Sequence, residues 1–254
     1  MPPFPSPTKT WHSTSYPKIS PTRPELSAKG KFVVVTGGGT GIGAETARSF
    51  TQAGATRIAL LGRRLQPLLD TKASIESQYP GVEVLTASTD VTDAAQVEEA
   101  FTSFTNNSTV KIDVLISNAG TMGPPGAILA SDPADFMAGV NSNIAGALHV
   151  ARAFLRSAAP DAVVVNVSSS ASHDTFGDIF GSYSVGKWGA IRLWDFVGKN
   201  NPGMRVYHIQ PGVVDTDMNR AAGGVEAMGY EDHGKLPPSP LLSNMRTSHM
   251  KTAS

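Results

Sequence analysis

Short apolar runs alternate with amphipathic segments along most of this chain. The first run, residues 32–35, is Phe-Val-Val-Val and has no polar position, which predicts a strand buried on both faces. Similar runs predict further strands at 57–61, 82–87, 112–116, 162–167 and 205–209. Strands that are apolar throughout are typical of a parallel sheet that helices cover on both sides.

The segments between these runs repeat apolar residues at helical spacing. In residues 93–104, this spacing places Val97, Ala100, Phe101 and Phe104 on one face. The same reasoning predicts helices at 41–53, 67–79, 93–104, 132–155 and 183–196, the fourth interrupted near residues 141–143. Strands and helices in alternation, without an internal repeat, predict a single α/β domain.

The two ends of the chain depart from this pattern. Residues 1–30 are rich in Pro, Ser and Thr, which predicts an extended leader that Trp11 and Tyr16 could anchor, with regular structure beginning at Lys31. Residues 221–254 contain Gly, Pro, Ser and Thr without a convincing helix or strand. We therefore expect a domain over residues 31–220 and an atypical tail over 221–254 that is poorly ordered.

Composition narrows the possible functions. Lys and Arg together number 21, and so do Asp and Glu, so the net charge indicates neither a nucleic acid nor a membrane as partner. The chain has no cysteine, which excludes disulfides, thiolate metal sites and cysteine nucleophiles. No apolar run reaches the ~18–20 residues of a membrane span, and we see no signal peptide. We expect a cytoplasmic protein.

A glycine-rich turn, T-G-G-G-T-G-I-G at residues 36–43, follows the first predicted strand and opens the first predicted helix. Glycines let the backbone approach a pyrophosphate, and a helix N-terminus offers free N–H groups to it. The alternative is an ordinary strand-to-helix turn, but the flanking strand and helix favour a nucleotide site. The residues expected to contact the cofactor here are Gly37, Thr40, Gly41, Ile42 and Gly43.

The end of the second strand indicates which dinucleotide is bound. An NAD site is expected to carry an Asp or Glu there for the ribose 2′-hydroxyl. This chain has Gly62-Arg63-Arg64 instead, which favours NADP, because guanidinium groups bind a 2′-phosphate. Arg63 is the preferred phosphate ligand, and Arg64 could equally be a solvated surface charge.

Two further strand ends carry candidate cofactor contacts. Asp90 can accept a hydrogen bond from the adenine amino group and the Val91 backbone can complement it, whereas Asp93 is expected to cap the next helix. Asn118 can tie neighbouring strand ends together, so its role could be mainly structural. Small residues, Ala119 and Gly120, follow it and would let the chain pass beside the cofactor.

Tyr183 and Lys187 are four residues apart in Y-S-V-G-K, which places them on the same face of one helix. A phenol is a poor acid or base at neutral pH, because its unperturbed pKa is near 10. A nearby positive charge typically lowers such a pKa by ~1–3 units. The pair is therefore a candidate general acid/base.

Several motifs occur together and in a specific order: T-G-G-G-T-G-I-G, D-V, N-A-G, N-I-A-G, N-V-S-S, Y-S-V-G-K and P-G-V-V-D-T. This combination, over about residues 31–218, resembles the short-chain dehydrogenase/reductase family. The resemblance implies one Rossmann-fold domain with a doubly wound parallel sheet, normally in the order 3-2-1-4-5-6-7. It also implies reversible hydride transfer between a nicotinamide cofactor and an alcohol or carbonyl substrate.

The resemblance also implies residue roles. Tyr183 matches the acid/base, and Lys187 matches the residue that lowers its pKa and binds the nicotinamide ribose. Ser169 matches the serine that polarises the carbonyl, with Ser170 as the alternative. Asn143 matches the asparagine that holds a water for proton relay, with Asn141 as the alternative. The positions matching the nicotinamide carboxamide site are Pro211, Val214 and Thr216.

The family pattern fails after residue 233, where we find no seventh strand. We expect one open sheet edge and a weakened dimer or tetramer. A catalytically silent dinucleotide-binding sensor or scaffold, or a defective family member, is the alternative to an enzyme. Substrate choice would depend on residues 121–132, 171–182 and 218–233, where the residues that could form an apolar pocket are Met122, Phe176, Phe180 and Met218. His173 and His208 have no spacing that indicates a metal site.

Overall fold

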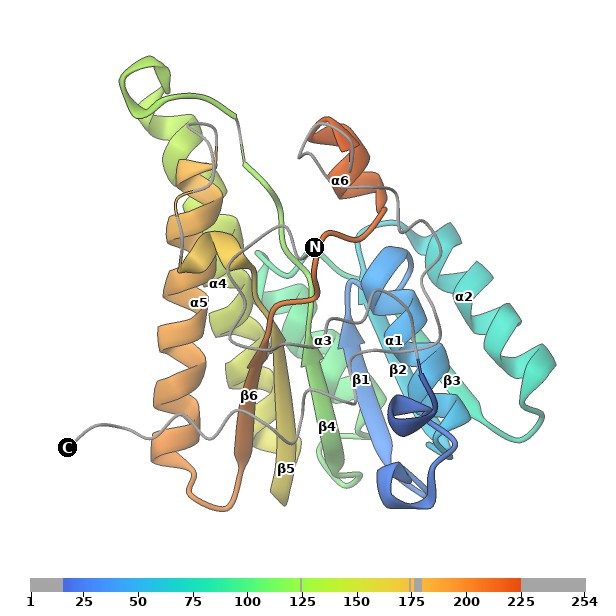
Figure 1. Ribbon diagram of the computed structural model, residues 1–254. Helices are drawn as coiled ribbons and strands as arrows, with labels where there is room; N and C mark the ends of the chain where they lie inside the picture. Colours follow the sequence, from blue (N-terminus) through green and yellow to red (C-terminus); the bar gives the residue numbers. More distant parts are fainter. Residues whose placement is uncertain (1–15, 124, 174, 176–179, 225–254) are drawn as a thin grey trace.

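The computed structural model of the chain describes residues 16–123, 125–173, 175 and 180–224, and shows an α/β fold around one sheet (Figure 1). The six strands lie in the order β3-β2-β1-β4-β5-β6, and every neighbouring pair is parallel. Their bounds are β1 Phe32–Thr36, β2 Arg57–Gly62, β3 Glu83–Ser88, β4 Ile112–Ser117, β5 Ala158–Val167 and β6 Arg205–Ile209. The predicted doubly wound sheet and its strand order are confirmed.

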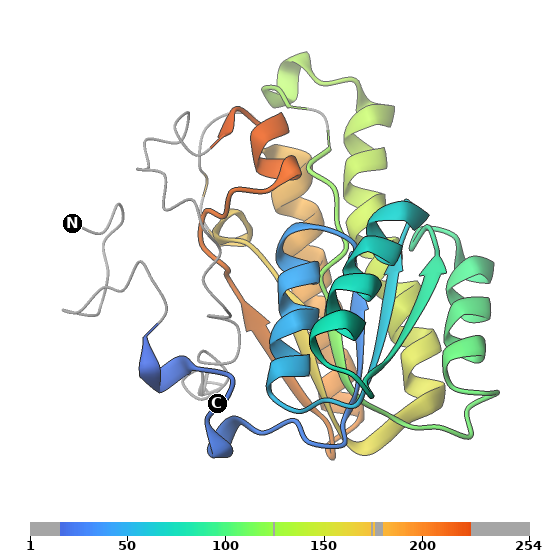
Figure 2. The same cartoon turned by 90° about the vertical axis from the view of Figure 1, so that its right-hand side faces the viewer.

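Helices cover both faces of this sheet (Figures 1 and 2). The α-helices are α1 Gly41–Gln52, α2 Leu65–Gln78, α3 Ala94–Phe104, α4 Pro133–Ser157, α5 Gly181–Asn200 and α6 Asp217–Ala221. Short 3₁₀ helices are η1 Pro17–Ile19, η2 Pro24–Leu26, η3 Ile128–Ala130 and η4 Ser170–Ser172. Side chains of α1 and α2 belong to one apolar core, and those of α3, α4 and α5 belong to the other.

The alternation of side chains along β1 shows why its sequence has no polar position before Thr36. Val33 and Val35 belong to the core under α1 and α2, whereas Phe32 and Val34 belong to the opposite core. Val33, Val34 and Val35 have 0% exposure, so a polar side chain on either face would lose its water. The predicted apolar face of α3 is likewise buried.

The long helix α4 differs from its prediction, because it is continuous across residues 141–143. The Asn143 side chain explains this: its Nδ2 donates to the Gly139 carbonyl one turn earlier, at 3.0 Å, and to the Thr121 carbonyl, at 2.9 Å. An asparagine inside a helix often competes for backbone hydrogen bonds. Here its amide is satisfied without a break in the helix.

Regular structure also begins earlier than predicted, at Pro17 rather than Lys31. Ile19 and Ala28 of the leader are buried, and the Ala28 amide donates to the Ala53 carbonyl at 2.8 Å. The part of the leader that is described therefore packs against the domain. Trp11 lies outside the described residues.

After β6, the short helix α6 was not predicted. Between β6 and residue 224, the last described position, no further strand is found. Residues 225–254 lie outside the described chain, so the open sheet edge and the poorly ordered tail stay predictions. Among the residues that the structure covers, no helix is both long and apolar enough to cross a membrane.

Candidate active site

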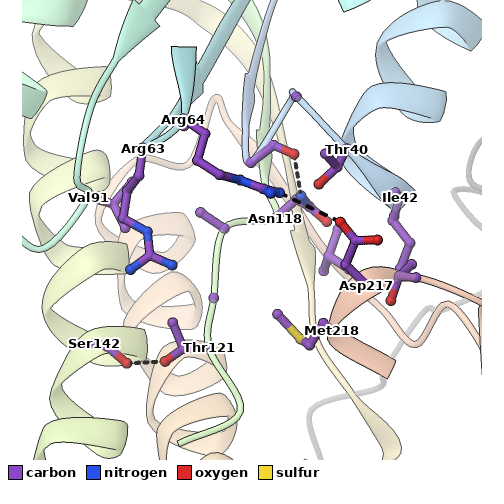
Figure 3. Close-up of a pocket in the computed structure, with 18 of the residues that line it drawn as sticks. Thr40, Ile42, Arg63, Arg64, Val91, Asn118, Thr121, Ser142, Asp217 and Met218 are labelled. Carbon is purple, nitrogen blue, oxygen red and sulfur yellow. Dashed lines mark hydrogen bonds and ion pairs between the residues drawn. The ribbon is translucent and has the colours of Figure 1, made fainter. Parts of the chain in front are cut away.

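A cleft of about 820 Å³ lies where the carboxyl ends of the strands meet α6 (Figure 3). Such crevices are where open parallel sheets bind ligands. The predicted site residues that line it are Gly37, Thr40, Gly41, Ile42, Arg63, Asp90, Val91, Asn118, Ala119, Gly120, Tyr183, Lys187, Pro211 and Thr216. Four predicted residues are not among the lining: Gly43, Asn143, Ser169 and Val214. Most of the candidate site is thus gathered around one cleft.

Gly43 lies beneath the glycine-rich turn rather than at the cleft surface. A β-carbon at this position would lie 2.2 Å from the Gly37 carbonyl oxygen, a distance that real β-carbons do not reach. Gly37 itself has a φ of +68°, in the left-handed region that favours glycine. These two glycines let the start of α1 lie directly against the end of β1, so that the N-terminus of α1 faces the cleft.

Asn118 joins the ends of β1 and β4, as predicted for a structural role. Its Nδ2 donates to the Thr36 carbonyl at 2.9 Å, and its backbone N–H donates to Thr36 Oγ1 at 2.9 Å. Thr36 Oγ1 also accepts from the Ala119 amide at 2.9 Å. Sequence reasoning did not single out Thr36, although its place before the first glycine was a usable signal.

The two arginines after β2 point in different directions (Figure 3). Arg63 extends toward Val91, whereas Arg64 extends toward Asp217 at the start of α6. Arg64 Nη2 lies 3.6 Å from Asp217 Oδ2, so its side chain is part of an ion pair. Asp217 lines the cleft but was not predicted, because nothing in the sequence indicates that the start of α6 approaches the residue before α2.

Asp90 also has partners in the protein. Its Oδ1 accepts from the Thr92 amide at 2.9 Å and from Thr92 Oγ1 at 2.8 Å. The hydrogen bond from the Thr92 backbone is the main reason that the pKa of Asp90 is lowered. Asp93 caps α3 by accepting from Ala95 and Gln96, which confirms its predicted capping role, whereas the contact of Asp90 with adenine stays a prediction.

The candidate acid/base, Tyr183, lies in the first turn of α5, with Ser169 close enough to act on the pKa of its hydroxyl group. Ser169 Oγ also accepts from the Ala171 amide at 3.2 Å, at the start of η4. The serine that acts on Tyr183 is therefore the preferred serine of the sequence analysis, whereas Ser170 lies within η4.

Lys187 is 7% exposed, and its Nζ donates to the Val167 carbonyl at 2.9 Å. The Nζ atom lies 5.7 Å from the centroid of the Tyr183 ring. Burial lowers the pKa of Lys187 to about 8. Burial also raises the pKa of Tyr183, and the hydrogen bond from Ser169 opposes that rise. The predicted fall in the pKa of Tyr183 is therefore wrong for this structure, because desolvation of the phenol outweighs the attraction expected from the lysine.

Asn143 lies next to Gly120, and the residue is only 4% exposed. Its Oδ1 atom is buried and has no hydrogen-bond partner in the part of the chain that the structure describes. A β-carbon at Gly120 would lie 2.7 Å from this Oδ1 and 3.1 Å from Lys187 Nζ, so both atoms border the same small space. Asn141, the alternative, is exposed.

The segment after β6 contributes unequally to the cleft. Pro211 and Thr216 line it, and Thr216 Oγ1 caps α6 by accepting from the Asn219 amide at 3.2 Å. The carbonyl of Val214 accepts from Asn219 Nδ2 at 3.0 Å. Met218 lines the cleft, while Phe176 lies outside the described residues.

His208 has a structural role on β6. Its Nε2 lies 3.1 Å from Asp195 Oδ1, and its Nδ1 lies 3.1 Å from Asn166 Nδ2. Burial lowers the pKa of His208. Within the described part of the chain, no group of three or more His, Asp or Glu residues could hold a metal ion.

Comparison with known proteins identifies the family. The family model for short chain dehydrogenases matches residues 31–225, so the chain belongs to that family. A short chain dehydrogenase of Aspergillus terreus, tazN, is 35% identical over 238 residues, which are 91% of this chain and 50% of that protein. The chain thus spans half the length of that relative.

Solved structures share the fold. An alcohol dehydrogenase from the archaeon Thermococcus sibiricus, complexed with 5-hydroxy-NADP, has a TM-score of 0.66 and 28% identity, covering 73% of this chain and 77% of its own. An NAD⁺-bound xylitol dehydrogenase has a TM-score of 0.68 and 30% identity, covering 73% of this chain and 71% of its own. Dehydrogenases of this fold therefore include proteins seen with either dinucleotide.

Proposed function

We propose that this protein is an oxidoreductase that uses NADP(H) to interconvert a small-molecule carbonyl compound and the corresponding alcohol. The observation that carries the proposal is that Tyr183 and the buried Lys187 line one cleft, with Ser169 close enough to Tyr183 to act on the pKa of its hydroxyl group. A protein that only binds a dinucleotide has no need of this arrangement. Membership of the dehydrogenase family supports the same conclusion.

The cleft fits a dinucleotide. The glycine-rich turn leaves room for a close approach, and the N-terminus of α1 directs backbone N–H groups and a positive dipole end toward it. Asn118, Ala119 and Gly120 also line the cleft, and so do Lys187 and Thr216. These residues would hold the cofactor, which supplies or accepts a hydride when it is bound.

NADP is favoured by the residues at the end of β2. Gly62 and Arg63 line the cleft, and no carboxylate follows the strand to accept from a ribose 2′-hydroxyl. The complexes of the two structural relatives include an NADP derivative in one and NAD⁺ in the other, so the choice depends on this chain's own residues. Arg63 would contact a 2′-phosphate with a charge-assisted hydrogen bond.

In the direction of reduction, Ser169 donates a hydrogen bond to the substrate carbonyl oxygen, and Tyr183 donates its proton to that oxygen as negative charge develops there. The raised pKa keeps the Tyr183 hydroxyl protonated before the reaction. With a pKa of about 8, Lys187 is mostly cationic at neutral pH, and its charge stabilises the phenolate left behind. In oxidation, the same groups would act in reverse.

Tyr183 must then recover a proton. The unpaired Oδ1 of Asn143 and the Nζ of Lys187 border one space beside Gly120. A water held between these atoms would satisfy the buried amide oxygen and connect Lys187 to a proton source. Asn143 is therefore proposed to hold this relay water, although it does not line the cleft itself.

The direct test is oxidation of NADPH in the presence of a panel of aldehydes and ketones, followed by absorbance, with NADH in parallel. The proposal expects carbonyl-dependent oxidation that is faster with NADPH and that Ser169→Ala greatly reduces. NADPH binding without oxidation by any member of a broad panel would favour a silent dinucleotide-binding protein instead.

A further inference from the structure

We propose that Asp217 competes with the phosphate groups of the dinucleotide for Arg64, and that it thereby lowers the affinity for the cofactor. The inference rests on the proposed function, because it concerns the same cleft. It assigns a role to an ion pair that neither the acid/base chemistry nor the choice between NADP and NAD requires.

The ion pair lies across the cofactor cleft. Arg64 is the N-cap residue of α2, and Asp217 is the first residue of α6, so the pair joins two elements that lie far apart in sequence. Their side chains approach to 3.6 Å, and both residues line the cleft. Figure 3 shows Arg64 reaching past the glycine-rich turn to Asp217, while Arg63 points away toward Val91.

The residue before Asp217 also lies against the glycine-rich turn. A β-carbon at Gly41, the first residue of α1, would lie 3.0 Å from Thr216 Cγ2. Residues 216 and 217 therefore lie close to the expected phosphate site on one side and to Arg64 on the other. A carboxylate is thus placed where the cofactor would bring negative charge.

Carboxylates and phosphates bind a guanidinium group in the same way, through its planar set of N–H donors. A pyrophosphate at the N-terminus of α1 would attract Arg64 and repel Asp217. Asp217 has a second cation close by, because its Oδ1 lies 3.3 Å from Arg220 Nη1. Cofactor binding would therefore exchange the Arg64–Asp217 pair for an Arg64–phosphate pair, while Asp217 keeps Arg220.

This exchange predicts a measurable effect of Asp217→Asn on affinity. Both residues of the pair are more than 60% exposed, and exposed ion pairs are weak, so the effect is modest. We expect the Kd for NADPH and the Kd for NADH each to fall about two- to fivefold. Both should fall because the pyrophosphate is common to the two cofactors.

The matched control is Asp215→Asn. Asp215 carries the same charge two residues earlier and pairs with Arg220 Nη2 at 2.7 Å, but it does not line the cleft. Its substitution removes the same charge without releasing Arg64, so the Kd for NADPH should change much less. In an Arg64→Gln background, Asp217→Asn should tighten binding less than in the wild type, because only the direct repulsion between Asp217 and the phosphates is then relieved.

The experiment measures the Kd for NADPH and NADH by fluorescence titration for the wild type, the three single variants and the double variant. Unchanged or weaker binding by Asp217→Asn overturns the proposal, and so does equal tightening by Asp215→Asn or in the Arg64→Gln background. A wild type that binds both cofactors but reduces no carbonyl would contradict only the proposed function. A wild type that binds neither would overturn both proposals.

Discussion

The two halves of the sheet build the candidate site by different means. The half formed by β1, β2 and β3 offers mainly backbone, because Gly37 and Gly43 bring the start of α1 against the strand end. The half formed by β4, β5 and β6 offers buried polar side chains, and Lys187 and Asn143 are 7% and 4% exposed. One half is shaped for an anion to approach, whereas the other surrounds groups that can exchange a proton.

This contrast predicts that substitutions in the two halves have different effects. A substitution in the glycine-rich half should act through space and charge, so its main effect is on cofactor binding and on folding. A substitution in the other half should act through protonation, so its main effect is on turnover or on the pH dependence of stability. Variants that separate binding from turnover therefore test whether the halves are as different as their geometry indicates.

The largest effect should come from Tyr183→Phe, which removes only the hydroxyl group. General acid/base catalysis typically contributes ~10²–10⁴-fold to a rate, so kcat should fall by at least ~100-fold. The Kd for NADPH should change little, because the glycine-rich half is unaltered. Steady-state kinetics and a binding titration on the same preparation check both quantities, and a variant with wild-type turnover would remove Tyr183 from the chemistry.

Lys187→Met should reveal the cost of burying a cation. The pKa of Lys187 is about 8 in the folded protein, below its ordinary value of 10.5, so the unfolded chain binds more protons between these pH values. The unfolding free energy of the wild type should thus rise with pH from about 8 to about 10.5, relative to the variant. The total rise expected is roughly 3 kcal/mol.

Urea unfolding of the wild type and of Lys187→Met at a series of pH values measures this difference. Below pH 8 the difference between the two proteins should be constant, because the lysine is protonated in both states. A difference that stays constant across the whole range would mean that Lys187 titrates as an exposed lysine does.

Gly43→Ala should destabilise the other half by steric overlap. The new methyl group would lie 2.2 Å from the Gly37 carbonyl oxygen, and overpacking of this kind typically costs ~1–3 kcal/mol. Gly62→Ala is the matched control, because its methyl group would meet Leu68 at an ordinary distance of 3.5 Å. Thermal melting should separate the two variants, and equal melting temperatures would show that the turn relaxes freely.

The smallest effect should come from Arg63→Gln, which alters cofactor choice. Loss of a charge-assisted hydrogen bond at an exposed side chain should raise the Kd for NADP about tenfold and leave the Kd for NAD nearly unchanged. Arg64→Gln provides the comparison, because it should weaken both cofactors alike. Equal losses for NADP and NAD with Arg63→Gln would contradict the assignment of the 2′-phosphate to this residue.

Much of the fold could be predicted from the sequence, because its core strands are apolar on both faces. The apolar composition of residues 32–35 and of one face of α3 predicts that these residues are buried, and both predictions are confirmed. The continuity of α4 could not be predicted in this way, because it depends on Asn143 finding the Gly139 and Thr121 carbonyls. Only the folded chain brings the loop at Thr121 to that helix.

The site was predictable to a similar extent. The order of motifs indicated most of the residues that gather at the cleft, among them those of the glycine-rich turn. The direction of the pKa shift of Tyr183 was wrong, because spacing on a helix gives the distance to a lysine but not the burial of the phenol. Asp217 was missed because its partner, Arg64, is 153 positions away in the chain (217 − 64).

The central claim is that both halves of the sheet serve a single hydride transfer. The most direct test supplies NADPH with deuterium at the transferred position, together with a reactive aldehyde or ketone, and analyses the alcohol product by mass spectrometry. The account predicts a deuterium atom on the carbinol carbon with the wild type and almost none with Tyr183→Phe. Saturating cofactor binding, with no label in the product of any substrate that the cleft admits, would contradict it.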